Sequence, residues 1–173
     1  MSKRDLFLAE LKSHYDKEFE LKNTLESKAN YILAAAGIVV TLLFSFGSPI
    51  IEKLAQHSEV FLTARVLLIT GISANVLAIL CSVLAFRITL YKYAMPSDAF
   101  YDDKGNLNDE VIAEYSDGND LDVFGDTMIE TYLDCNRHND AMNNEKTIKI
   151  KIAQWSFFTG IVIIPLIIVL IMK

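Results

Sequence analysis

The run from Ala29 to Ile51 constrains this chain more than any other stretch, because it contains no Asp, Glu, Lys, Arg or His. A helix rises about 1.5 Å per residue, so about 20 apolar residues suffice to cross the ~30 Å hydrocarbon core of a bilayer. Two further runs of this kind follow at 66–86 and 152–172. The sequence therefore predicts an all-α membrane protein with three transmembrane helices.

The segments between these spans are short. Of the 173 residues, 52% are hydrophobic, and the three runs use much of that share. The other segments are 1–28, expected as a cytoplasmic amphipathic helix, 52–65, expected as a short external loop, and 87–151, expected as a cytoplasmic acidic insert followed by a helix. None of them is long enough for a complete catalytic domain.

The basic residues predict the orientation of the spans. All of the 16 Lys and Arg residues except Lys53, Arg65 and Lys173 fall in 1–28 or 87–151. Because cytoplasmic segments of membrane proteins carry an excess of Lys and Arg, we expect the N-terminus and 87–151 in the cytoplasm. The C-terminus and 52–65 are then expected outside the inner membrane of the cell.

Helical patterns extend beyond two of the spans. Before the first span, apolar residues recur on one helical stripe, with charges on the other face: Leu8, Leu11, Tyr15, Phe19 and Leu25. No helix breaker occurs between Asp5 and Gly47. A second uninterrupted pattern leads from near Phe124 into the third span. We therefore predict two long helices that extend from the membrane into the cytoplasm.

The segment from Asp98 to Asp134 contains twelve acidic residues and one base, Lys104. Such a charge repels nucleic acid and anionic lipid headgroups, so no nucleic acid partner is expected. Turn-forming residues surround a short helix predicted at 108–115. The acidic residues lack the spacing of a calcium-binding loop, so no metal site is predicted.

Small residues recur three or four positions apart on the first two spans, where they allow helix backbones to approach closely. On the first span they are Ala34, Gly37, Thr41, Ser45 and Ser48. On the second they are Gly71, Ala74, Ala78, Cys81 or Ser82, and Ala85. We predict that both stripes are packing surfaces, either within one chain or between chains of a homo-oligomer.

Two polar features near or within the spans are candidate sites. Asn75 lies deep in the second span, where an amide either bonds a neighbouring helix or lines a pore. Before the third span, polar residues of the kind that bind anionic ligands gather on one predicted helix: Asn136, Arg137, His138, Asn139 and Lys146. The alternative is that this cluster, with Trp155, anchors the helix at the membrane surface.

Several kinds of catalytic chemistry have no motif in this sequence. It contains no phosphate-binding glycine loop, no Cys-x-x-Cys pair and no set of histidines with the spacing of metal ligands. We therefore predict no catalytic residue, no cofactor and no enzymatic activity.

Two stretches resemble a known family. The sequence Leu25-Glu-Ser-Lys-Ala-Asn-Tyr-Ile-Leu-Ala-Ala-Ala-Gly37 is similar to that of small prokaryotic membrane effectors, the Pycsar transmembrane effectors and the related SLATT-type proteins of antiphage systems. The stretch Tyr132-Leu-Asp-Cys-Asn136, with Asn139, Asn143 and Lys146, is similar to the Asn-rich helix before the last span in such proteins. The acidic insert has no counterpart that we can match.

The resemblance implies a dormant membrane homo-oligomer. A cyclic nucleotide or similar signal, made by a partner enzyme during phage infection, would cause it to permeabilise the inner membrane. Two other hypotheses fit the residues: a non-conducting membrane scaffold or sensor that recruits a cytoplasmic partner through the acidic insert, and a constitutive channel or transporter subunit. The latter has less support, because only Asn75 is strongly polar at depth.

Overall fold

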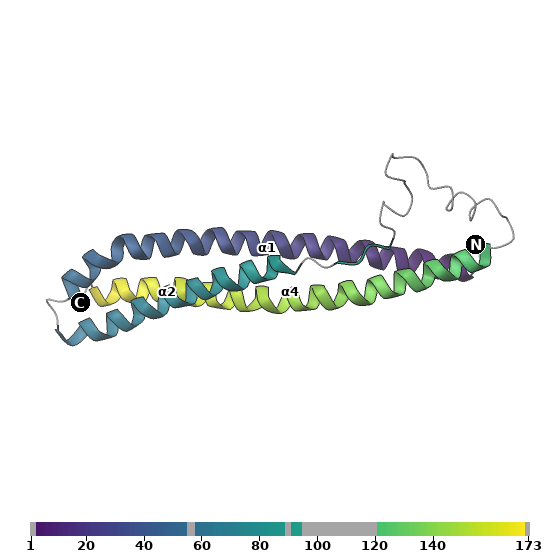
Figure 1. Ribbon diagram of the computed structural model, residues 1–173. Coiled ribbons are helices and arrows are strands. Elements are labelled where there is room, and N and C mark those ends of the chain that lie inside the picture. Colours follow the sequence, from purple (N-terminus) through teal and green to yellow (C-terminus); the bar gives the residue numbers. More distant parts are fainter. Residues whose placement is uncertain (1–2, 55–57, 89–90, 95–120, 172–173) are drawn as a thin grey trace, which may run out of the picture. The chain divides into compact units, whose positions relative to one another are not determined.

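The computed structural model describes residues 3–54, 58–88, 91–94 and 121–171. Within these residues the chain forms three helices and no strand: α1 (Lys3–Leu54), α2 (Ser58–Arg87) and α4 (Leu121–Ile171) (Figure 1). Helices α1 and α4 contain 52 and 51 residues. The all-α fold and the two long helices are thus as the sequence predicts.

The chain divides into two compact units. The first, which we call the polar unit, comprises residues 1–22 and 90–143, and the second, the span unit, comprises 23–89 and 144–173. Helices α1 and α4 contribute residues to both units, and α2 belongs to the span unit alone.

All three helices contain a stretch that is long and apolar enough to cross a membrane. The candidate spans are Lys3–Gly47, Phe61–Arg87 and Met128–Leu170. They include all of the second uncharged run of the sequence and most of the first and the third. Many of their large apolar side chains are exposed, among them Ile38, Ile69 and Phe158. Such outward-facing apolar side chains suit a lipid environment, where no water has to be excluded.

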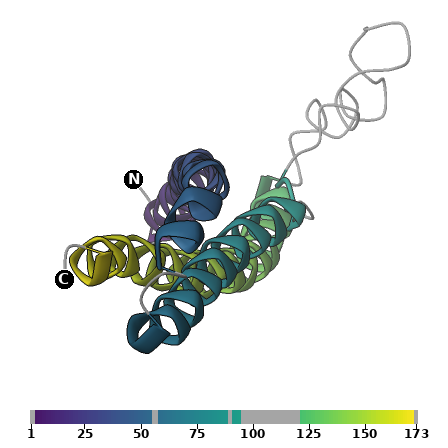
Figure 2. The ribbon, with the colours of Figure 1, turned by 90° about the vertical axis from the view of Figure 1, so that its left-hand side faces the viewer.

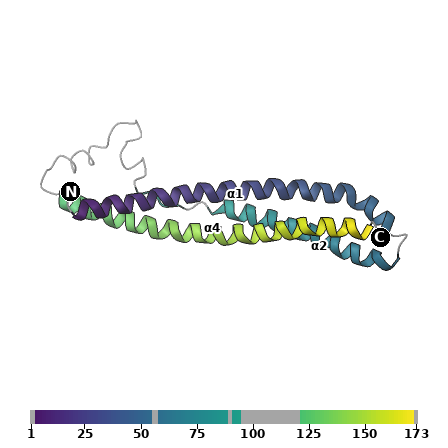
Figure 3. The same cartoon turned by 180° about the vertical axis from the view of Figure 1, so that it is seen from behind.

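In the span unit, α2 runs antiparallel to α1 and α4 (Figures 1 and 3). Figure 2 shows the ends of the three helices grouped together. The core consists of two buried clusters with members from all three helices. One contains Leu25, Ala29, Ile32, Ala36, Ala78, Cys81, Ala85, Ile150 and Ala153, and the other Leu43, Leu68, Ile163 and Ile167.

A close approach of α2 and α4 depends on glycine. A Cβ atom added to Gly71 would lie 3.2 Å from Cγ2 of Ile163, closer than most real contacts of this kind. The hydrogen of glycine therefore lets the α2 backbone pack directly on the Ile163 side chain.

The two small-residue stripes differ in their environment. On α2, Gly71, Ala78 and Ala85 are buried and Ala74 is half-buried. On α1, by contrast, Ala34 and Thr41 are exposed and Gly37 is half-buried, with no atom within 4 Å of an added Cβ. The α1 stripe therefore makes no close packing within the described part of the chain. A role in packing between chains stays a prediction.

The helices also continue beyond the expected spans. Pro49 lies inside α1, which ends only at Leu54, and α2 begins at Ser58. Parts of the segment 52–65, expected as a loop, are therefore helical. Most of the acidic insert, including the helix predicted at 108–115, lies outside the described residues.

Candidate functional site

The polar residues predicted on α4 lie mainly on one buried face of that helix. Asn136, Asn139 and Asn143 are at most 7% exposed, and Lys146 is fully buried. Their spacing of three, four and three positions keeps them on one side of α4. Buried amides require hydrogen-bond partners, so each of these residues indicates what α4 packs against.

Asn143 joins three segments of the polar unit. Its Nδ2 donates to the backbone oxygen of Glu18 at 2.9 Å and to the Glu18 carboxylate at 2.6 Å. Its Oδ1 accepts from the Tyr91 hydroxyl at 2.5 Å. One asparagine on α4 thus contacts α1 and the segment that follows α2.

The Asn139 side chain forms hydrogen bonds with both the N–H and the carbonyl group of the Lys92 backbone. The Lys92 N–H donates to Oδ1 of Asn139 at 2.9 Å, and Nδ2 of Asn139 donates to the Lys92 carbonyl at 3.0 Å. This pair satisfies a segment without helical partners of its own, as buried backbone groups require.

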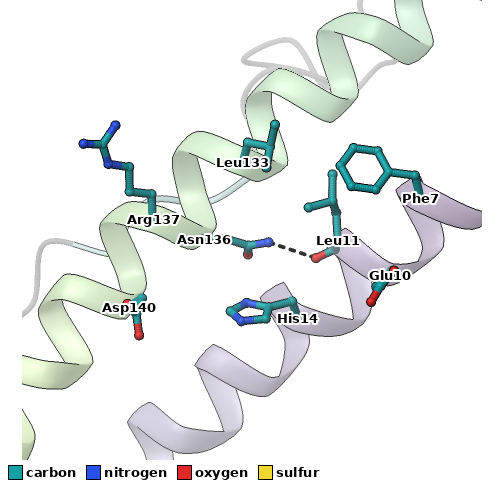
Figure 4. A pocket seen from close by; sticks show the side chains of 8 residues that line it. All are labelled: Phe7, Glu10, Leu11, His14, Leu133, Asn136, Arg137 and Asp140. Atoms are coloured by element: carbon teal, nitrogen blue, oxygen red, sulfur yellow. Dashed lines mark hydrogen bonds between the residues drawn. The ribbon is translucent and has the colours of Figure 1, made fainter. Parts of the chain in front are cut away.

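Asn136 lies beside a groove in the polar unit. Its Nδ2 donates to the Leu11 carbonyl at 3.1 Å, while its buried Oδ1 has no hydrogen-bond partner among the described residues. The groove has a volume of about 520 Å³. It is lined by Phe7, Glu10, Leu11, His14, Leu133, Asn136, Arg137 and Asp140 (Figure 4).

The lining of this groove combines apolar and charged groups. Phe7 and Leu133 are large exposed apolar side chains. Figure 4 shows the Arg137 guanidinium directed away from Asn136. The groove therefore offers an aromatic ring and side chains of both charges to a small polar ligand, whereas Oδ1 of Asn136 is buried.

Aromatic side chains form a cluster next to this face. The Tyr15 ring lies 4.9 Å from that of Phe19 and 5.4 Å from that of Tyr132. The Lys22 ammonium lies 4.7 Å from the centre of the Tyr91 ring, a cation–π distance. Burial raises the pKa of Tyr15 and of Tyr132, so both phenols are neutral at physiological pH.

An exposed ion pair and a buried thiol complete the polar unit. The Lys92 ammonium donates to Oδ2 of Asp134 at 2.6 Å. This hydrogen bond raises the pKa of Lys92 and lowers that of Asp134. Burial raises the pKa of Cys135, which keeps the thiol protonated and poorly reactive.

In the span unit, Lys146 forms an ion pair with Glu26. Its Nζ lies 2.5 Å from Oε1 of Glu26, and the Lys146 side chain is fully buried whereas that of Glu26 is 30% exposed. A buried ammonium needs such a partner, because removing an unpaired charge from water is costly. The pair therefore fixes α4 against α1 at this level.

Asn75 is fully buried in the span unit. Its Nδ2 donates to the carbonyl of Gly71 on its own helix at 2.9 Å. A Cβ atom added to Gly160 of α4 would lie 2.0 Å from this nitrogen. Asn75 is thus placed between α2 and α4.

Some of these residues were predictable from the sequence and others were not. Of the five candidate ligand residues, Asn139 and Lys146 form contacts within the chain, and Asn136 and Arg137 border the groove; His138 is half-buried. Missed were Glu18, Tyr91, Lys92 and Gly160, and Ser82 was predicted only as a small packing residue. Glu18 gave one usable signal, since it lies within three residues of Tyr15 on the amphipathic stripe.

Comparison with known proteins identifies the family of this chain. A search among curated proteins and a search among solved structures both gave no match. The family model described as the Pycsar effector protein domain matches residues 11–173, which include all three uncharged runs and the asparagines of α4. Proteins with this domain are membrane effectors and not enzymes. The chain belongs to the family of Pycsar transmembrane effectors.

Proposed function

We propose that this chain is an oligomeric inner-membrane effector of antiphage defence, which a cytoplasmic nucleotide signal triggers to permeabilise the membrane. Family membership supports the membrane-acting and antiphage parts of this function. The distribution of basic residues supports an orientation with the N-terminus and the polar unit in the cytoplasm and the C-terminus outside.

The observation that carries the proposal is the continuity of α1 and α4. Each of these helices contributes to the polar unit and, without interruption, to the span unit. A ligand that prefers one packing of the polar unit therefore acts on the same two helices that cross the membrane. Such a preference is required, because a ligand shifts an equilibrium only by its difference in affinity for the two states.

The groove beside Asn136 is the proposed trigger site. Its volume of about 520 Å³ accommodates a mononucleotide, and its lining includes Phe7, Asn136 and Arg137. The Arg137 guanidinium, which is directed away from Asn136, would turn toward the groove to meet a phosphate (Figure 4). An aromatic ring can stack on a base, and arginine is the preferred partner of phosphate. His138 and Asn139 would hold α4 in position next to the groove. We assign Lys146 to the ion pair with Glu26 in the span unit.

Packing between chains is proposed along the α1 stripe of Ala34, Gly37 and Thr41. These residues are exposed or half-buried in one chain, and small residues in a span favour helix association. A homo-oligomer of this kind would bring several triggered copies together.

The function is tested with the full chain in proteoliposomes loaded with a potassium-sensitive dye. We expect a nucleotide cyclase product, tested as a panel of 3′,5′-cyclic mononucleotides, to cause leakage. A linear 5′-mononucleotide serves as the control. The proposal is wrong if no cyclic nucleotide raises leakage and if expression together with a Pycsar nucleotide cyclase leaves the cell's membrane potential intact.

A further inference from the structure

Two fully buried polar side chains lie on one face of α2, Asn75 and Ser82, each 0% exposed. They are seven positions apart, which is about two helical turns. Both carry an oxygen, Oδ1 of Asn75 and Oγ of Ser82, that has no hydrogen-bond partner among the described residues. The hydrocarbon core of a membrane contains no water that could supply the missing hydrogen bonds. Burial of both oxygens in this packing therefore costs free energy.

Other polar side chains of the spans behave differently. The hydroxyl groups of Thr41, Thr70 and Thr159 are exposed, and each donates to a backbone carbonyl four residues earlier at 2.9 Å. These hydroxyls are satisfied by their own helix. The unpartnered oxygens of Asn75 and Ser82 instead face the interior of the span unit.

Gly160 of α4 closes the space in front of Asn75. An added Cβ at Gly160 would lie 2.0 Å from Nδ2 and 2.8 Å from Cγ of Asn75. No side chain larger than that of glycine fits there unless Asn75 moves or α4 withdraws from α2. The observed position of the Asn75 side chain between α2 and α4 thus depends on this glycine.

We infer that Asn75 and Ser82 line a path for water and small ions, which opens inside the three-helix bundle of a single copy when α4 moves away from α2 at Gly160. This inference rests on the proposed membrane permeabilisation and locates its path. Opening would give both oxygens water as a partner. Ala78, which lies between them on the same face of α2, would leave the path wide there.

The α1 stripe is a poorer candidate for the wall of the path. Its hydroxyl groups on Thr41 and Ser45 already donate to carbonyls of α1. They gain no hydrogen bond from water that they lack in the present packing, whereas Asn75 and Ser82 do. We therefore place the path within each copy, with the α1 stripe used for packing between copies.

The first experiment forces the two helices apart at Gly160. In proteoliposomes without any trigger, we expect Gly160→Ala to raise leakage about tenfold, a bias of the size that overpacking imposes on a closely packed core. Combining it with Asn75→Ala removes the clash and should return leakage to the wild-type level. Gly47→Ala is the matched control, because its added Cβ would lie at an ordinary 3.6 Å from Leu68. Unchanged leakage in folded Gly160→Ala overturns the inference.

The second experiment reads access directly and does not depend on how Gly160→Ala folds. Ser82→Cys is introduced with both native cysteines replaced by serine, and a charged, membrane-impermeant methanethiosulfonate is added with and without trigger. We expect labelling of Ser82→Cys to rise at least about tenfold on triggering, since water must reach the residue if it lines the path. Val83→Cys, at an exposed neighbouring position, should stay unlabelled in lipid.

These results separate the inference from the proposed function. If triggered vesicles leak while Ser82→Cys stays inaccessible and Asn75→Leu conducts normally, the permeabilisation is real but its path lies elsewhere. If no trigger causes leakage yet Gly160→Ala leaks through an accessible Ser82→Cys, the path is correct and the proposed trigger is wrong. Thr159→Val, an exposed change one residue from Gly160, should alter neither measurement.

Discussion

Asn143 binds Glu18 through both the backbone oxygen and the carboxylate of that residue, although the two are 125 positions apart in the sequence. The same amide accepts from the Tyr91 hydroxyl. Three segments of the polar unit therefore depend on a single buried side chain, which makes Asn143 the most informative residue to remove.

Asn143→Ala should destabilise the polar unit by about 2 to 4 kcal/mol, because it leaves the Glu18 and Tyr91 groups without this buried partner. Limited proteolysis of the detergent-solubilised protein would detect earlier cleavage within residues 1–22 and 121–143. Asn144→Ala, at the exposed neighbouring position, is the control and should change little. Equal sensitivity of the two variants would contradict the assigned role.

The buried pair of Lys146 and Glu26 should behave as a coupled unit. Lys146→Met alone or Glu26→Leu alone should lower the free energy of unfolding by about 3 to 5 kcal/mol at most. The loss should be larger for Glu26→Leu, because this change leaves a fully buried ammonium without this carboxylate. The double variant should recover most of that loss, since an apolar pair of similar volume is often as stable as a buried ion pair. Thermal unfolding in detergent measures all three.

The matched control for this cycle is the pair of Lys149 and Glu145, four positions apart on α4 and more exposed. Lys149→Met should cost no more than about 0.5 kcal/mol. An equal effect of Lys149→Met and Lys146→Met would show that burial contributes nothing to the ion pair of Lys146.

The ion pair of Lys92 and Asp134 makes a prediction about pH. The pKa of Asp134 is lowered, so its contribution to stability is complete above the usual value of 3.8 and is lost as the pH falls through the lowered value. The pKa of Lys92 is raised, so its contribution is complete below 10.5 and is lost as the pH rises through the raised value. Between these limits the pair should add no pH dependence.

Proteolysis of the polar unit as a function of pH tests this expectation. Asp134→Asn removes the ion pair. The variant should therefore lack the loss of stability that protonation of Asp134 causes in the wild type below pH 3.8. A difference between wild type and Asp134→Asn that varies between pH 5 and pH 9 would contradict the assignment.

Gly37 offers a test of packing between chains. Because an added Cβ meets no atom within 4 Å among the described residues outside its own stretch of α1, Gly37→Leu should leave the fold of one copy intact. If the α1 stripe packs between copies, the larger side chain should shift the protein toward monomers by about tenfold, a loss of about 1.4 kcal/mol. Cross-linking in native membranes measures this shift. Val76→Leu, at an exposed position of α2, is the control.

The fold was largely predictable because span length and charge are strong signals. Lipid demands about 20 apolar residues per helix, and the three uncharged runs meet that demand without ambiguity. The continuity of α1 and α4 followed from the absence of breakers. Pro49 lies inside α1 and Pro165 lies inside α4, so neither proline ends its helix.

The buried face of α1 was harder to predict. Ala34, Ala35 and Ala36 are consecutive, so they point in directions about 100° apart, and a pattern of small residues cannot select one of them. The structure buries Ala36, with Ala29 and Ile32, and exposes Ala34.

The partners of the asparagines were not predictable either. Residues 91–94 are not helical and have no hydrophobic period, so nothing in their sequence indicates that Asn139 binds the Lys92 backbone or that Ala94 donates to the Tyr15 hydroxyl. Gly160 was missed, and Ser82 was predicted only as a small packing residue, because the close contact of Gly160 and the burial of the Ser82 hydroxyl depend on how the helices pack in three dimensions.

The contact between Asn139 and Lys92 has a consequence for variation within a lineage. Asn139 recognises only main-chain atoms of residue 92, so mutation of that residue's side chain leaves these two hydrogen bonds intact. The side chain at position 92 can therefore change without loss of these two hydrogen bonds, although its ion pair with Asp134 requires a basic residue. Proline would remove one of the two hydrogen bonds, because it lacks the required N–H.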